Sequence, residues 1–185
     1  MKLAVAYLTQ LRVGVVAVFA ALLLACSAER SPTTVLAPPP PSSQPSRVQC
    51  NVTLIADGDT FDCAGVGRVR FIGIDAPEMG QSPFGAQARA ELIRLMPIGT
   101  LVRLERDVSE KDVYGRHLAY VWQGAVFMNE LLVKRGYALS ASYPPDTAMI
   151  PRLREAEVNA REALAGLWQT GGFDCTPREW RQDRC

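Results

Sequence analysis

The sequence predicts an α+β domain that combines a small β-barrel with helices. Short runs of β-branched and aromatic residues are separated by Gly, Pro and Asp turns, and three other stretches repeat apolar residues at helical spacing. We expect strands at residues 49–56, 60–63, 69–74, 100–106 and 118–122, with a short piece near 137–141. Five strands in a compact, partly open barrel form the OB-fold arrangement, which commonly binds nucleic acids or saccharides. The strand count alone does not identify that fold.

Three helices are expected. Ser82 is placed to cap the first, Pro83 occupies its opening position, and the Pro and Gly at 97 and 99 end it. The second is brief, about residues 128–135, and is ended by a glycine. The third covers residues 150–167, where the apolar positions form one core-facing stripe. These positions are Leu153, Ala156, Ala160, Ala163, Leu164 and Leu167.

The first 46 residues differ in composition from the rest. Basic residues precede an apolar run at 13–25, which is too short for a transmembrane helix and suits a signal-peptide core, so residues 1–25 are predicted to be a signal peptide. The sequence Leu-Leu-Ala-Cys at 23–26 resembles a bacterial lipobox, which predicts a lipid anchor at Cys26. Ordinary cleavage with free release is the alternative. The remaining segment, 26–46, is rich in Pro and Ser and is expected to be an extended tether.

Cysteine usage agrees with export to the cell envelope, in the periplasm or on the outer face, or with release outside the cell. Beyond the N-terminal segment the chain has four cysteines, which allow three pairings. Cys50 and Cys63 lie on the two arms of an expected hairpin, at comparable distances from its turn. Cys175 and Cys185 bracket a C-terminal tail, residues 171–185. We therefore predict the disulfides Cys50–Cys63 and Cys175–Cys185. These spacings also exclude a CxxC metal or redox site.

Acidic residues gather at the ends of two neighbouring strands. Asp57-Gly58 stands between two strand-like runs and is the usual hairpin signal, so its simplest interpretation is a turn. Asp59 follows at once, and the run at 69–74 breaks into Asp75 and then Glu78. Like charges held this close repel one another unless a cation lies between them, and Ca²⁺ and Mg²⁺ bind carboxylate oxygens. The pattern therefore favours a site for a divalent cation.

Other kinds of site are excluded by what the chain contains. Arg68 stands where an EF-hand loop needs its glutamate, so these acids do not form an EF-hand. The single histidine, His117, gives too few ligands for a His-rich zinc site or a mechanism based on two histidines. Carboxylates and arginines remain, and these suit phosphoryl chemistry.

Four segments carry a resemblance to a known family. They are DGDT at 57–60, VRFIGIDAPE at 69–78, DVYGRHLAY at 112–120 and MNELLVKRG at 128–136. In this order they resemble the staphylococcal nuclease (thermonuclease) family, over roughly residues 48–168. The resemblance implies an OB-fold barrel with three helices and a nuclease domain at 47–170.

The resemblance also implies a metal site. Asp59 and Asp75 would be the ligands of Ca²⁺, with Mg²⁺ as an alternative, and the backbone carbonyl of Ala76 would be a third ligand. Asp57 would lie beside the metal and act through water, and Thr60 would support the site next to it.

The catalytic groups follow from the same resemblance. Glu78 matches the general base toward the attacking water, and Arg70 and Arg116 match two phosphate-binding arginines. A buried ion pair is the alternative for Arg70, and a surface turn is the alternative for Arg116. Tyr114 is a candidate for stacking on a base or sugar, with core packing as the alternative, and Lys111 is a candidate for the rim of the site.

The charge of the domain limits how it would bind a polyanion. From residue 47 onward, 17 Lys and Arg stand against 18 Asp and Glu, a net of −1, which excludes binding by bulk positive charge. We expect a monomeric, metal-dependent phosphodiesterase that cuts DNA and RNA to 3′-phosphate products, with no protein partner. The alternatives are a catalytically inactive OB-fold module that binds nucleic acid and an envelope lipoprotein that binds calcium.

Overall fold

The computed structural model describes residues 47–185. The predicted signal peptide, the lipidation site at Cys26 and the tether lie outside the described residues. Within 47–185, no helix is both long enough and apolar enough to cross a membrane.

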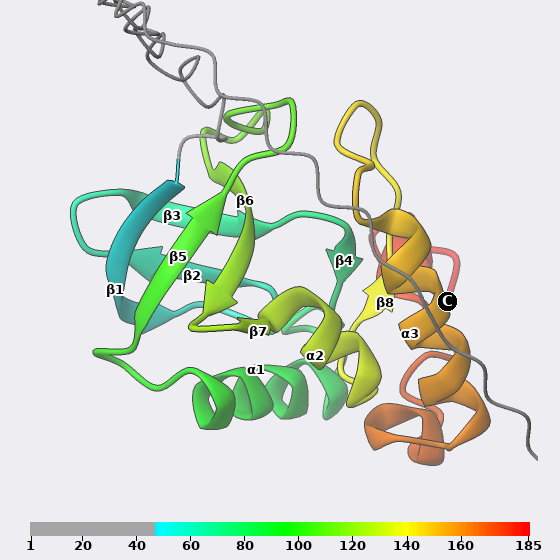
Figure 1. Ribbon diagram of the computed structural model, residues 1–185. Helices are drawn as coiled ribbons and strands as arrows, with labels where there is room; N and C mark the ends of the chain where they lie inside the picture. The colour runs from blue at the N-terminus through cyan, green and yellow to red at the C-terminus, as the bar shows by residue number, and fades with distance from the viewer. Residues whose placement is uncertain (1–46) are drawn as a thin grey trace, which may run out of the picture. The chain divides into compact units, whose positions relative to one another are not determined.

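Five strands form a closed β-barrel (Figure 1). They are β1 (Arg47–Ile55), β2 (Thr60–Cys63), β3 (Gly67–Phe71), β5 (Leu101–Glu105) and β6 (His117–Gln123). Neighbours are antiparallel in the order β3-β2-β1-β5-β6, and β3 pairs with β6 in parallel, with Val69 opposite His117. This last pairing closes the barrel and removes its open edges. The predicted five-stranded barrel is confirmed, and it is closed rather than partly open.

The predicted strand 69–74 is divided in two. β3 ends at Phe71, and the separate β4 (Ile74–Asp75) pairs with β8 (Leu139–Ser140) instead of with the barrel. Gly73 lies between them at φ 77°, a left-handed conformation that favours glycine. This break turns the chain, so that Asp75 is placed beside the end of the barrel. A further two-residue strand, β7 (Val126–Phe127), pairs with β6.

The helices are α1 (Phe84–Leu95), α2 (Met128–Lys134), α3 (Ile150–Glu162), the 3₁₀ helix η1 (Gly166–Thr170) and the short α4 (Pro177–Trp180). α1 runs beneath the barrel in the view of Figure 1. The predicted cap at Ser82 is wrong: Pro83 precedes the helix, and no side chain caps it. The third helix ends earlier than predicted, because Leu164 adopts φ 49° and is exposed with Ala163 outside the stripe. α4 was not predicted.

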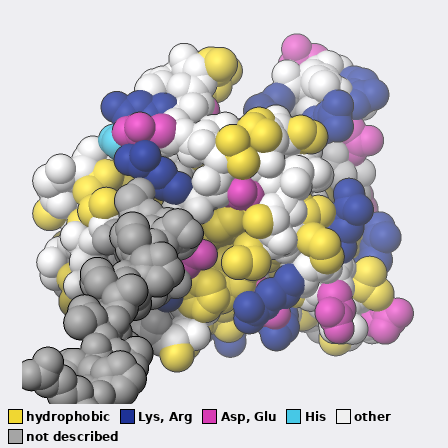
Figure 2. Space-filling view, turned by 45° about the horizontal axis from the view of Figure 1, so that its top comes forward, with side chains coloured by type: hydrophobic (Ala, Val, Ile, Leu, Met, Phe, Trp, Pro, Cys, Tyr) yellow, Lys and Arg dark blue, Asp and Glu magenta, His cyan; other side chains and the backbone are white. Residues whose placement is uncertain are grey.

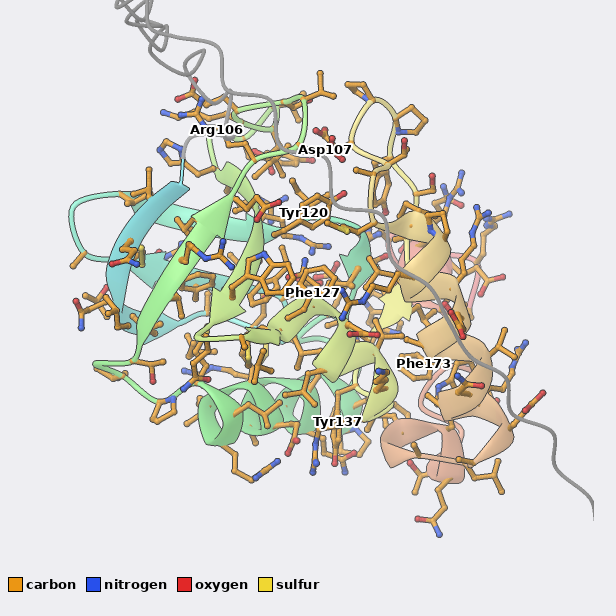
Figure 3. All side chains as sticks on the ribbon, in the orientation of Figure 1. Arg106, Asp107, Tyr120, Phe127, Tyr137 and Phe173 are labelled. Atoms are coloured by element: carbon orange, nitrogen blue, oxygen red, sulfur yellow. A yellow bond between two sulfur atoms is a disulfide. The ribbon has the colours of Figure 1, made fainter. Side chains whose placement is uncertain are left out.

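The core joins the barrel to α1, α2 and α3. Phe61, Phe71 and Leu92 are completely or almost completely buried in it. Tyr120 is buried as well, and its ring meets Phe127 edge-on at 5.9 Å between centroids (Figure 3). The Tyr120 hydroxyl donates to Asp107 Oδ2 at 2.8 Å, which fastens the loop after β5 to the core.

Both predicted disulfides are present. Cys50–Cys63 joins β1 to β2 across the hairpin, and both cysteines are buried in the core. Cys175–Cys185 closes the C-terminal tail around α4. The tail is thereby a covalently closed loop of its own.

Candidate active site

A cavity of about 920 Å³ opens at the end of the barrel where β3 leaves for β4. Its wall includes most of the site residues singled out from the sequence. These are Asp57, Asp59, Arg70, Ala76, Glu78, Lys111, Tyr114 and Arg116. Asp75 and Thr60 are not part of this wall but contact residues that are: Asp75 pairs with Arg70, and Thr60 bonds Asp59. Two segments far apart in the chain, 57–78 and 111–116, are therefore brought to one place.

Asp59 is held at the inner end of the cavity. Its backbone N–H donates to Asp57 Oδ1 at 3.0 Å, the Thr60 hydroxyl donates to its Oδ1 at 3.1 Å, and the backbone N–H of Ala76 donates to its Oδ2 at 2.7 Å. Burial, together with the negative charges of Asp57 and Asp75, raises the pKa of Asp59 to about 7, although Arg70 opposes the shift. This carboxylate therefore lies where added positive charge would stabilise it.

Only glycine fits at position 58 of this turn. A Cβ there would lie 2.7 Å from the Cβ atoms of both Ala76 and Ala88. Ala76 belongs to the segment after β4, and Ala88 belongs to α1. The turn of the first hairpin is thus packed between α1 and the segment after β4. This packing explains how a local hairpin turn also fixes the position of the neighbouring Asp57 and Asp59.

Arg70 joins the two predicted metal ligands. Its Nη2 lies 3.0 Å from Asp59 Oδ2 and 3.1 Å from Asp75 Oδ1, and its Nη1 donates to the carbonyls of Phe71 and Ile74. The buried ion pair considered from the sequence is therefore present. Because Arg70 also lines the cavity, the ion pair and a role toward a phosphate are compatible.

Arg116 reaches the cavity from the loop before β6. Asp112 Oδ1 accepts the backbone N–H groups of Tyr114 and Arg116, and Arg116 Nε donates to Asp112 Oδ2 at 2.6 Å. Burial acts to raise the pKa of Asp112, but the hydrogen bonds from Arg116 and Tyr114 outweigh it and hold that pKa below its usual value. The Tyr114 ring lies 5.4 Å from the Arg116 guanidinium and is 80% exposed, so core packing of Tyr114 is wrong.

One residue of the site was missed from the sequence. Arg181, in the C-terminal tail, donates from Nη1 to Asp75 Oδ1 at 3.0 Å and from Nη2 to Asp75 Oδ2 at 2.7 Å. The same Nη1 donates to Glu78 Oε1 at 2.6 Å. These contacts raise the pKa of Arg181, which stays charged. The only sequence signal was its position in the C-terminal tail, between the two cysteines predicted to pair.

The comparisons with known proteins agree with this geometry. The family model described as "Staphylococcal nuclease homologue" matches residues 68–170, more than half of the chain. This chain belongs to the staphylococcal nuclease family. It is 35% identical over 125 residues to a thermonuclease of Staphylococcus hyicus, which covers 63% of this chain and 73% of that protein. It is 34% identical over 135 residues to endonuclease YncB of Bacillus subtilis, which covers 66% of this chain and 64% of that protein.

A third relative, an uncharacterized protein of Bacillus anthracis, is 36% identical over 135 residues, which are 68% of this chain and 63% of that protein. The chain thus spans less than two thirds of that relative and of YncB. Arg181 lies beyond the part that the staphylococcal nuclease family model matches.

The carboxylates at the inner end of the cavity fit a hard divalent cation, in keeping with the metal dependence of the staphylococcal nuclease family. We name these carboxylates the acid cluster: Asp57, Asp59, Asp75 and Glu78. Two guanidinium groups, those of Arg70 and Arg181, contact this group of four, so the carboxyl groups outnumber the cations that contact them. Among residues 47–185, no three His, Cys, Asp or Glu side chains are close enough to form a metal cluster alone. The fit is therefore to a cation held by two carboxylates and completed by backbone oxygen and water, a kind of site that Mg²⁺ and Ca²⁺ accept.

Proposed function

We propose that this protein is a metal-dependent phosphodiesterase that hydrolyses DNA and RNA. The observation that carries the proposal is the convergence of Glu78, Arg70 and Arg116 on one cavity that the acid cluster borders. Membership of the staphylococcal nuclease family supports it, as do relatives named thermonuclease and endonuclease.

Glu78 has the position of a general base. Arg181 binds its Oε1, and among the described residues Oε2 accepts no hydrogen bond. Oε2 is therefore the oxygen that would take a proton from a water molecule attacking phosphorus. By the family resemblance, the 5′-oxygen would leave and the products would carry 3′-phosphates.

The arginines would bind the phosphate that reacts. Within residues 47–185, Nε makes the one side-chain hydrogen bond of Arg116, to Asp112, so its two Nη groups remain as donors for phosphate oxygens. Arg70 adds a second guanidinium from the neighbouring strand β3, where it pairs with Leu118 of β6. Charge-assisted donors held in place in this way stabilise the charge that develops on the phosphorane.

Asp59 and Asp75 would hold the divalent cation, with the carbonyl of Ala76 as a further ligand. Such a cation polarises a phosphoryl oxygen and stabilises negative charge at phosphorus. Asp57 supports this arrangement by fixing the backbone of Asp59. We propose Ca²⁺ for this position, with Mg²⁺ as the alternative.

Binding of the polymer would depend on the cavity rather than on the whole surface. Basic and acidic side chains are interspersed on the face seen in Figure 2. Tyr114 and Lys111, both exposed at the rim, would contact the neighbouring nucleotides. We therefore expect weak binding that depends on the cation and falls only modestly with salt.

Digestion of plasmid DNA and of RNA tests the proposal. The protein is incubated with each substrate in Ca²⁺, in Mg²⁺ and in EDTA, and cleavage is expected with at least one cation and not in EDTA. The ends are then read by treatment with a 3′-phosphatase before extension by a polymerase. Binding without cleavage in every buffer would contradict the proposal and favour a nucleic-acid-binding module.

We also propose that the protein is exported and anchored through a lipid on Cys26. Support comes from the two disulfides of the domain, because disulfides persist in oxidising compartments. Labelling with a fatty-acid analogue is expected for the full chain and not for Cys26→Ala. A Cys26→Ala variant that stays labelled would contradict the anchor.

A further inference from the structure

The C-terminal tail (171–185) is built to hold one conformation. Thr176 and Glu179 form a reciprocal cap at the start of α4, in which each side chain bonds the backbone N–H of the other residue. Cys175 and Cys185 are joined across this short helix. The segment that carries Arg181 is therefore closed both by hydrogen bonds and by a covalent bond.

Two contacts fasten this tail to the segment that follows β4. The buried side chain of Gln81 accepts the backbone N–H of Glu78 at 2.8 Å and donates to the carbonyl of Cys175 at 2.9 Å. The indole of Trp180 covers Gly80, where an added Cβ would lie 3.4 Å from the ring. The tail and the Glu78 backbone are thus held at a defined separation.

Arg181 extends from this tail to the acid cluster. Its guanidinium donates hydrogen bonds to both carboxylate oxygens of Asp75 and to one oxygen of Glu78. The Arg181 side chain is 39% exposed, so solvent screens its ion pairs, although its partner Asp75 is 5% exposed. Asp75 is in addition already paired with Arg70. The charge of Asp75 therefore does not depend on Arg181 alone, and the guanidinium of Arg181 also contacts Glu78, whose side chain is 39% exposed.

We propose that Arg181 is a positioning residue of the active site, which aims Glu78 at the water and limits how tightly Asp75 binds the cation. The proposal rests on the proposed function. It adds to that function a residue that lies outside the part of the chain matched by the family model. The hydrogen bond to Oε1 restrains the carboxylate of Glu78, a residue that lines the cavity. With both oxygens of Asp75 engaged by a positive charge, a cation binds there in competition with Arg181.

The proposal has two consequences of opposite sign. Loss of the guanidinium leaves Glu78 free to rotate, so kcat falls by about 10- to 100-fold, the effect typical of groups that orient metal-site residues. The same change removes a positive charge next to Asp75, so the Kd for Ca²⁺ decreases by about tenfold. A residue with a purely structural role would not improve cation binding while impairing turnover.

The test compares Arg181→Gln and Arg181→Lys with Arg184→Gln, a matched control in the same closed tail that lines neither described cavity. Calorimetric titration with Ca²⁺ gives Kd without nucleic acid, digestion of single-stranded DNA at saturating Ca²⁺ gives kcat and KM, and melting gives Tm. We expect Arg181→Gln to show lower kcat, tighter Ca²⁺ binding and unchanged Tm. Arg181→Lys should recover part of kcat, and Arg184→Gln should match the wild type.

Several results would overturn the proposal. One is a kcat for Arg181→Gln within twofold of Arg184→Gln together with an unchanged Kd for Ca²⁺. Another is faster turnover than the wild type at saturating Ca²⁺, because the arginine would then obstruct the site. If neither wild type nor Arg184→Gln cleaves nucleic acid, the proposed function fails, and the Kd for Ca²⁺ still decides whether Arg181 opposes the cation.

Discussion

Two buried carboxylates of this protein are each held by two arginines, yet they have different surroundings. Asp75 meets Arg70 and Arg181, and its side chain is 5% exposed. Glu91, on α1, meets Arg94 and Arg135, and its side chain is 8% exposed. We name the group around Glu91 the helix clamp, because it joins α1 to the end of α2.

The balance of charge separates the two groups. Hydrogen bonds from Arg94 and then Arg135 lower the pKa of Glu91 despite its burial, and every charge that shifts it is positive. Asp75 instead belongs to the acid cluster, where carboxylates outnumber guanidinium groups and border a cavity. Arginine–carboxylate pairing therefore does not by itself mark a functional site. The proposed site differs from the helix clamp in that its carboxyl groups outnumber the arginines in contact with them and border a cavity.

The largest expected effect is on turnover in the acid cluster. Glu78→Gln keeps the shape of the side chain but cannot take a proton, so kcat is expected to fall by about 10²- to 10⁴-fold. Tm should stay within about 2 °C of the wild type, because the Glu78 side chain is 39% exposed and its ion pair adds little stability.

The matched change in the helix clamp, Glu91→Gln, should leave kcat unchanged. Digestion at saturating Ca²⁺ and thermal melting of both variants give the comparison. Equal losses of kcat in the two variants would show that the distinction between the acid cluster and the helix clamp is wrong.

Much of the acid cluster could be predicted from the sequence, because its residues follow local strand and turn patterns. The hairpin, the acids after it and the strand 69–71 are encoded by alternation and turn residues. The turn at Asp57 to Asp59 and Asp75, after the predicted strand 69–74, were thus expected at neighbouring strand ends. The structure places Asp59 and Asp75 in contact with Arg70.

The features that were missed depend on tertiary contacts and backbone conformation rather than on the spacing of apolar residues along the sequence. The apolar pattern of α3 continues past Glu162, but the left-handed backbone at Leu164 ends the helix. Arg181 lies 106 residues from Asp75, in a tail with no repeating pattern that could place it. The positions of the two cysteines predict where the loop is closed, but they do not predict which of its side chains faces the domain.

Removing the tail disulfide should have a smaller effect on turnover than Glu78→Gln. In the pair Cys175→Ser and Cys185→Ser, the cap on α4 and the Gln81 contact remain, so Arg181 is held more loosely but not lost. We expect kcat to fall less than in Arg181→Gln, by about three- to tenfold, and stability to fall by at most ~3 kcal/mol.

Urea unfolding and digestion at a temperature well below Tm separate these two effects. The corresponding pair at Cys50 and Cys63, which joins two barrel strands away from Arg181, is the control and should lose stability without a specific loss of kcat. A tail variant with full kcat would show that the cap and Gln81 suffice to place Arg181.

A smaller effect is expected on the stability of the helix clamp. Glu91→Gln removes the charge that two arginines share, and we expect a loss of about 1–2 kcal/mol in the free energy of unfolding. Urea unfolding at pH 7 measures it against Glu155→Gln, an exposed acid of α3. A loss no larger than that of the control would mean that solvent screens the clamp as fully as an ordinary surface ion pair.

The smallest and most specific effect is the pH dependence of that loss. Because the folded-state pKa of Glu91 is below its ordinary value of 4.5, its contribution is present above pH 4.5 and disappears as the pH falls through the folded-state value. The gap in unfolding free energy between wild type and Glu91→Gln should therefore be constant from about pH 6 to 7 and narrow as the pH falls below 4.5. Glu155→Gln should show no such narrowing. A gap that does not narrow over the acid range in which the protein stays folded would mean that hydrogen bonds rather than charge hold the clamp, and the contrast with the acid cluster would then rest on the open cavity alone.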